Sequence, residues 1–379
     1  MKKAYLDNAS TTAMHPGVIA EMTAAMAGIY GNPSSAHSFG RTAKVLLETA
    51  RKTIASCINA EAREIIFTSG GTEANNLILR SAVKDLGIRR IISSRVEHHS
   101  VLNTLPALQA EFNIQVVYVN LLPGGQPDMV HLETLLQEQL PTLVSLMHVN
   151  NETGTVLNLQ QTGGLCRQYN ALFHTDTVQS VGKTELNLQL LPVDFLVASA
   201  HKFHGPKGVG FAFIRKNIAL QPMIYGGEQE KGLRAGTEAI HQVAGMAKAL
   251  ELSCKNLEAE RAHITAVKKY LLDQLALYFT GFKVNGATEG LGDSLFYNIA
   301  NVLLPLPEEK TAMILFNLDM LGVAVSRGSA CQSGSVKPSH VLKEILSAGD
   351  VKKPSLRISF SHYNTTDDVD IFIDALKTV

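Results

Sequence analysis

The chain has 379 residues, with 34 lysines and arginines balanced by 34 aspartates and glutamates. A net charge of zero without a basic run excludes the electrostatic footprint of a protein that binds nucleic acid or an anionic membrane. Because the length exceeds that of one usual hydrophobic core, we expect a large domain and a smaller one.

The N-terminus and the cysteines predict the compartment. Residues 1–8 lack the apolar core of a signal peptide, and no apolar run approaches the roughly 18 residues that a membrane span needs. The four cysteines have no CxxC spacing, which argues against a zinc ribbon or a disulfide framework. They are Cys57, Cys166, Cys254 and Cys331. We therefore expect a soluble, cytoplasmic protein in a reducing compartment.

The first elements are a polar turn and two helices. Residues 7–12 are polar and turn-forming, and a helix begins at His15-Pro16, with proline near its first turn. The sequence breaks at residues 31–35, and a long helix follows. Its apolar residues are spaced by four and share one face: Leu46, Ala50, Ile54 and Ile58.

A strand over residues 64–68 then runs into Ser69-Gly70-Gly71-Thr72 at the start of another helix. The glycines let backbone N–H groups converge there, and the positive end of the helix dipole favours a phosphate. Neither the Walker pattern nor GxGxxG is present, which disfavours a nucleotide site.

Strands and helices alternate in the following region. Strands are expected over residues 90–93, 115–119 and 143–148, and helices from about residue 98 and over 131–139. This spacing predicts βαβ units, a mostly parallel sheet and a ligand site beyond the carboxyl ends of its strands. Five residues of interest each follow a predicted strand: Thr72, His98, Asn151, Asp176 and Lys202.

Asp176 and Lys202 point to a cofactor. Asp176 ends a short apolar strand, where a carboxylate can pair with a protonated pyridine nitrogen. Lys202 lies in a tight loop between apolar runs at 194–198 and 209–214, where a partly desolvated amine suits Schiff-base chemistry. Together with the predicted phosphate site at residues 69–72, they predict a pyridoxal phosphate site.

The C-terminal part predicts the second domain. Residues 239–279 have a helical pattern that carries the chain out of the large domain, and strands are expected near residues 296–299, 322–325 and 356–360. We expect a large domain over residues 14–250 and a smaller α+β domain over 1–13 and 251–379. Cys331 belongs to the latter, in a small, polar segment suited to an accessible thiol.

With these motifs, the chain resembles the cysteine desulfurases of the class V aminotransferase group nearly end to end. The resemblance implies an α/β protein of the fold-type I architecture of pyridoxal-phosphate-dependent transferases. It also implies a homodimer that converts L-cysteine to L-alanine and leaves the sulfur on Cys331 as a persulfide. The segment Gly328-Ser329-Ala330-Cys331 resembles the long-loop class of these enzymes.

The resemblance also implies a role for each site residue. Lys202 would hold pyridoxal 5'-phosphate covalently and move the proton at the substrate Cα, Asp176 would keep the pyridine nitrogen protonated, and Arg357 would clamp the α-carboxylate. The further cofactor contacts that it implies are Gly71, Thr72, His98, Asn151, Gln179, Ser199, His201 and Thr237. Of these, His98 would also exchange protons, Asn151 would also touch the substrate, and Thr237 would reach the partner subunit's site.

Several alternatives stay open. A selenocysteine lyase or another class V enzyme, such as an aminotransferase, could share these motifs, as could a non-catalytic binding module. A metal protein is a further alternative, with ligands from His98, His99, His201 and His204. The sequence has no HExxH or CxxC pattern to support such a site, so we expect none.

Three residues depart from the family pattern: Glu228, Lys231 and Arg327. They bear on the dimer loop and on sulfur delivery. The sequence leaves the sulfur acceptor undetermined, whether for iron–sulfur cluster assembly or for tRNA thiolation. Some members of the family dock an iron–sulfur scaffold through a C-terminal extension. This sequence ends at Val379, soon after its last helix, so docking of such a scaffold is also undetermined.

Overall fold

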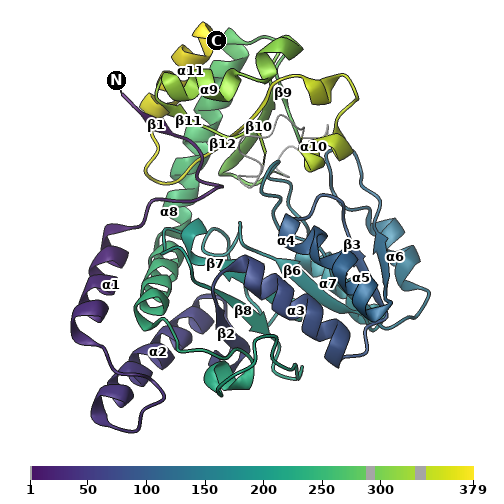
Figure 1. Ribbon diagram of the computed structural model, residues 1–379. Coiled ribbons are helices and arrows are strands. Elements are labelled where there is room, and N and C mark those ends of the chain that lie inside the picture. Colours follow the sequence, from purple (N-terminus) through teal and green to yellow (C-terminus); the bar gives the residue numbers. More distant parts are fainter. Residues whose placement is uncertain (1, 287–294, 329–338) are drawn as a thin grey trace.

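A computed structural model describes residues 2–286, 295–328 and 339–379, and its largest element is a seven-stranded sheet (Figure 1). Its strands, in spatial order, are β2 (Ile65–Thr68), β8 (Gly210–Ile214), β7 (Phe195–Ser199), β6 (Leu172–Asp176), β5 (Thr142–Ser145), β3 (Arg90–Ser93) and β4 (Gln115–Tyr118). The five from β7 to β4 run parallel, and β8 is antiparallel to both β2 and β7. The expected mostly parallel sheet is confirmed.

Helices cover both faces of this sheet, and the strands are therefore apolar on both sides. Along β7, Phe195 and Val197 pack with α3 (Gly71–Asp85), α4 (His99–Leu102) and α5 (Thr104–Phe112), whereas Leu196 packs on the opposite face. That face is covered by α1 (Pro16–Gly28), α2 (Ser38–Cys57), α6 (Met129–Leu136), α7 (Leu159–Gln168) and the first part of α8. Continuous apolar strands are typical of a parallel sheet buried on both faces.

Helix α8 (Ile240–Tyr278) joins the sheet body to a smaller body (Figure 1). Its residues up to Leu250 pack in the sheet core, and those from Ile264 onward pack in a second hydrophobic cluster. The domain boundary expected near residue 250 falls inside this helix and stays a prediction. No helix within the described ranges, α8 included, is long and apolar enough to cross a membrane.

Within the described residues, the smaller body contains two short sheets and three helices besides the end of α8. One sheet has the antiparallel order β12 (Ser355–Ser359), β10 (Ile299–Leu303) and β9 (Lys283–Val284), and the other pairs β1 (Ala4–Tyr5) with β11 (Val323–Ala324) in parallel. The helices are α9 (Ile314–Met320), α10 (His340–Ile345) and α11 (Thr366–Thr378). The first residues of the chain thus pack against elements near its end.

The strand predicted near residues 296–299 is wrong by several residues. The chain turns at 297–298, where Ile299 N–H donates to the carbonyl of Phe296 at 3.3 Å, and β10 begins only at Ile299. All five residues of β10 are buried between β9 and β12. Aromatic residues suit a strand by propensity, but the turn that precedes the buried run sets its start.

Residues 226–237 form a loop that a buried ion pair ties to the sheet body. Arg51 of α2 donates both Nη groups to the carboxylate of Glu230, at 2.7 and 2.8 Å, and Phe67 N–H donates to it at 2.7 Å. Both charged side chains are buried, and the backbone at Glu230 has a positive φ of 47°. The pair therefore holds the loop in a conformation that its backbone would not favour alone.

We predict that Glu230→Ala lowers the free energy of unfolding by about 3–5 kcal/mol, because it leaves the Arg51 guanidinium buried without its counter-ion. Urea unfolding followed by circular dichroism measures the loss. The matched control is Glu228→Ala, an exposed change in the same loop that should shift the free energy by less than about 0.5 kcal/mol. Equal losses in the two variants would contradict the role given to the ion pair.

Candidate active site

A pocket of about 500 Å³ lies beyond the carboxyl ends of the central strands. It is the place where a sheet of this type binds ligands. Ten residues singled out from the sequence line it: Gly71, Thr72, His98, Asn151, Asp176, Gln179, Ser199, His201, Lys202 and Arg357. They come from both bodies of the protein and meet in one space.

Lys202 is held by the N-terminal segment. It ends a short 3₁₀ turn after β7, and its Nζ donates to the backbone carbonyls of Ala9 at 2.7 Å and Ser10 at 2.6 Å. Thr12 N–H in turn donates to the carbonyl of His201 at 2.9 Å. The amine therefore has a defined position in the pocket wall.

Asp176 is fixed by two donors. It ends β6, and its carboxylate accepts from Asn75 Nδ2 at 2.8 Å and from Val178 N–H at 3.0 Å. Asn75 follows Thr72 by three residues on α3, so both lie on one helix face. The sequence interpretation missed Asn75, although this spacing was a signal for it.

One end of the pocket suits an anion. Gly70 precedes α3 with a φ of 151°, and no side chain caps that helix there. A Cβ on Gly71 would lie 2.7 Å from Val178 Cγ2, so only glycine fits this close approach. The first N–H groups of a 15-residue helix are thus open to the pocket beside Thr72 and Ser199.

The charges beside this end do not exclude an anion. Burial, together with the charges of nearby lysines, lowers the pKa of His201 to about 4, so the ring is neutral near pH 7. Its Nδ1 lies 3.1 Å from Thr11 Oγ1. Burial alone would raise the pKa of Glu73, but hydrogen bonds from Arg234 and Ser69 lower it overall. The Arg234 guanidinium, with its Nε 2.9 Å from Glu73, offsets that negative charge.

His98 lines the pocket and His99 does not. The Nδ1 atom of His98 lies 2.8 Å from Ser100 Oγ and accepts from Ser100 N–H at 3.2 Å. Burial lowers the pKa of His98, so the ring is neutral near pH 7. The ring of His99 lies 4.5 Å from that of His340, outside this pocket. The geometry thus selects the first histidine of the pair.

Gln179 presents an acceptor to this region. Its Nε2 donates to the carbonyl of Ala9 at 2.9 Å, whereas its buried Oε1 has no hydrogen-bond partner in the part of the chain that the structure describes. A buried acceptor without a donor costs free energy unless a bound molecule supplies one. Gln179 is therefore suited to a hydroxyl of a ligand in the pocket.

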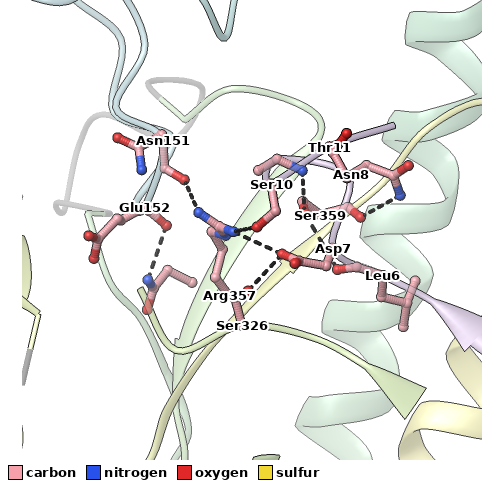
Figure 2. Close-up of polar contacts among 12 residues, drawn as sticks. Leu6, Asp7, Asn8, Ser10, Thr11, Asn151, Glu152, Ser326, Arg357 and Ser359 are labelled. Atoms are coloured by element: carbon pink, nitrogen blue, oxygen red, sulfur yellow. Dashed lines mark hydrogen bonds and ion pairs between the residues drawn. The ribbon is translucent and has the colours of Figure 1, made fainter. Parts of the chain in front are cut away.

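Arg357 of β12 forms the wall contributed by the smaller body (Figure 2). Its Nη2 donates to Asp7 at 2.8 Å and to Ser10 Oγ at 2.6 Å, and its Nη1 donates to the carbonyl of Asn151 at 2.9 Å. Arg357 is 1% exposed. Its guanidinium is therefore locked in position at the edge of the pocket.

Two predicted site residues need separate mention, because one lies outside the pocket lining and the other is not described. Thr237 is exposed in the loop over residues 226–237. Cys331 lies outside the described residues. The other three cysteines lie in helices, and burial raises the pKa of the Cys166 thiol. Within the described ranges, no group of three or more His, Cys, Asp or Glu side chains could hold a metal ion.

Comparison with known proteins gives a consistent result. The family model "Aminotransferase class-V" matches residues 4–372. "Putative cysteine desulfurase IscS 1" of Bacillus subtilis is 39% identical over 374 residues, 97% of this chain and 96% of that protein. "Cysteine desulfurase IscS" of Dictyoglomus turgidum is 37% identical, covering 100% of this chain and 94% of that protein.

Solved structures with the same fold are also similar over the full length. A "NifS-like protein" superposes with a TM-score of 0.90 at 32% identity, covering 100% of this chain and 99% of that one. "SspA in complex with cysteine" superposes with a TM-score of 0.80 at 30% identity, covering 96% of this chain and 100% of that one.

Proposed function

This chain belongs to the cysteine desulfurases of the class V aminotransferase family, and we propose that it converts L-cysteine to L-alanine and collects the sulfur on Cys331 as a persulfide. The observation that carries the proposal is the pocket itself. It combines the amine of Lys202, the fixed carboxylate of Asp176 and the guanidinium of Arg357 with an anion cradle at the start of α3.

These residues fit pyridoxal 5'-phosphate. The α3 N-terminus, with Gly71, Thr72, Ser199 and His201, would hold the phosphate, and Asp176 would hold the protonated ring nitrogen. Gln179 would accept from the ring hydroxyl with its unpaired Oε1, and His98 would lie against the ring. When bound, this cofactor supplies an electron-withdrawing ring that delocalises negative charge developing at the substrate Cα.

The chain's own groups account for the other steps. Arg357, with Asn151 beside it, would orient the substrate α-carboxylate, and the Lys202 amine would move the proton at Cα. The neutral imidazole of His98 could exchange a second proton. The Cys331 thiolate would then attack the substrate sulfur. As that S–S bond forms, the bond between the substrate sulfur and Cβ breaks and its electron pair stays on Cβ. This carbon then takes a proton and becomes the methyl group of alanine.

Product analysis tests this function against its alternative. L-Cysteine, L-selenocysteine and an amino acid with a keto-acid acceptor are offered separately to the cofactor-loaded protein. We expect alanine and protein-bound sulfur from L-cysteine. Alanine from selenocysteine alone would identify a selenocysteine lyase, and amine transfer to the keto acid would identify an aminotransferase.

We further propose that the protein is a homodimer in which Thr237 of each chain completes the phosphate site of the other. The exposed position of Thr237, outside its own chain's pocket, supports this arrangement. Since the loop that carries it is anchored by Glu230, it would be presented in a fixed conformation.

Mixed dimers test this contact. A Lys202→Ala chain paired with a Thr237→Ala chain would put both defects in one site and leave the other site intact. We expect such heterodimers, purified with two different affinity tags, to have about half of the wild-type activity. Activity no higher than the mean of the two parent homodimers would show that each site is self-contained.

A persulfide on Cys331 must be discharged in every cycle, so an acceptor is required. We propose a cytoplasmic sulfur-acceptor protein, such as an iron–sulfur scaffold or a tRNA-thiolating enzyme. Transfer of labelled sulfur from the loaded protein to each purified candidate would identify it.

A further inference from the structure

The N-terminal segment is fixed beside Arg357 on strand β12 (Figure 2). Ser359, two residues after Arg357, binds this segment through several contacts, and its N–H donates to the carbonyl of Leu6 at 2.8 Å. Its carbonyl accepts from Asn8 N–H at 3.3 Å and from Asn8 Nδ2 at 2.9 Å, and its Oγ accepts from Ala9 N–H at 2.8 Å. Ser10 N–H donates to the carbonyl of Asp7 at 3.0 Å, which closes a turn over residues 7–10. These contacts place the Ser10 side chain at the guanidinium.

The donors of Arg357 are largely committed. A guanidinium has five N–H groups. Those on Nη2 go to Asp7 and Ser10, and one on Nη1 goes to the carbonyl of Asn151. Nε is buried and has no partner among the described residues. The two open N–H groups, on Nε and Nη1, do not form a parallel fork, because each bidentate fork of a guanidinium uses an N–H of Nη2. Unless a contact is displaced, an entering carboxylate therefore receives only one of its hydrogen bonds from Arg357, and its second oxygen needs a different donor.

The hydroxyl of Ser10 meets that need. Arg357 can only donate, so Ser10 Oγ is the acceptor in their 2.6 Å contact and its own proton is directed elsewhere. Across residues 2–286, 295–328 and 339–379, no acceptor for that proton is found. Ser10 is half-buried and lines the pocket together with Lys202 and Arg357.

We propose that Ser10 is a further substrate-binding residue, whose hydroxyl donates to the substrate α-carboxylate beside Arg357. The proposal rests on the proposed function, which supplies an amino-acid substrate. Two features favour a hydroxyl donor at this position. The cationic N–H that donates to Oγ polarises the hydroxyl. Asp7 also pairs with Arg357 at 2.8 Å, so part of the guanidinium charge is already compensated before a substrate enters.

The contact would be the same before and during the reaction, because the carboxylate does not change charge. Loss of the hydroxyl should therefore raise KM and leave kcat nearly unchanged. A merely structural role for Ser10 would instead alter the position of Arg357 and Lys202 and would affect every amine ligand. Cysteamine, which is cysteine without its carboxylate, separates these two effects.

The experiment compares L-cysteine with cysteamine in Ser10→Ala and Ser10→Thr holoenzymes. Dissociation constants are taken from the change in cofactor absorbance, measured in a Cys331→Ser background. We expect Ser10→Ala to weaken L-cysteine binding by roughly tenfold, the usual effect of a hydrogen bond to a charged group, and to leave cysteamine binding unchanged. Ser10→Thr, which keeps the hydroxyl, should restore most of the difference.

Equal weakening of both ligands in Ser10→Ala, or weakening of neither, would overturn the proposal. Ser10→Cys offers a second variant with a weak donor, and its affinity for L-cysteine should lie between those of wild type and Ser10→Ala. Failure of the proposed function looks different: the wild type would then make no alanine from L-cysteine, whatever the Ser10 variants bind.

Discussion

Lys202→Ala should abolish covalent attachment of the cofactor and lower alanine production from L-cysteine by roughly 10⁴-fold or more. The reason is positional. The Lys202 amine is held between the carbonyls of Ala9 and Ser10, in the same pocket as Asp176, and substitution removes both the attachment point and the base for the Cα proton. Borohydride reduction of the wild type, followed by peptide mass spectrometry, should place the cofactor on the peptide that contains Lys202.

Lys207 provides the matched control, because it lines the same pocket. Lys207→Ala should keep the covalent cofactor and lose far less activity than Lys202→Ala. Recovery of the reduced cofactor on Lys207, or covalent attachment that survives Lys202→Ala, would refute the assignment.

Cys331→Ser should separate the two halves of the reaction. Cofactor binding and its absorbance response to L-cysteine should persist, because neither needs a second thiol. Alanine formation should nevertheless fall by roughly 10³-fold or more, because a serine hydroxyl is a far poorer nucleophile than a thiolate near neutral pH. Spectral titration and alanine assays on the same preparation measure both quantities.

The remaining cysteines are the controls for this change. Cys166 is buried in α7, and Cys57 and Cys254 are half-buried where α2 meets α8. Serine at any of these positions should alter stability more than turnover. If Cys331→Ser made alanine at close to the wild-type rate, the reaction would instead be that of a lyase that does not use its own cysteine.

The sheet and the strand-end residues were predictable because their signals are local. Strands such as β2 and β3 appear in the sequence as short apolar runs, and Asp176 and Lys202 follow such runs directly. The reversal of direction at β8 was predictable too, since the ten residues between β7 and β8 are too few for a parallel crossover.

The contacts that complete the site were not predictable in this way. Ser10 and Lys202 are 192 residues apart in the chain, and Asp7 and Arg357 are 350 apart. In the sequence, residues 7–12 suggest only a polar turn, because nothing local shows that their carbonyls face an amine. Tertiary packing of the N-terminal segment on β12 decides their role, and hydrophobic periodicity carries no information about it.

The most direct test of the central claim is a single turnover with one equivalent of L-cysteine and no added thiol. Alanine is counted, and the mass of the Cys331 peptide is measured after alkylation of its sulfur. The account predicts alanine and one extra sulfur atom on Cys331 in equal amounts. Alanine formed without added sulfur on that peptide, or sulfur found on Cys57, Cys166 or Cys254 instead, would contradict it.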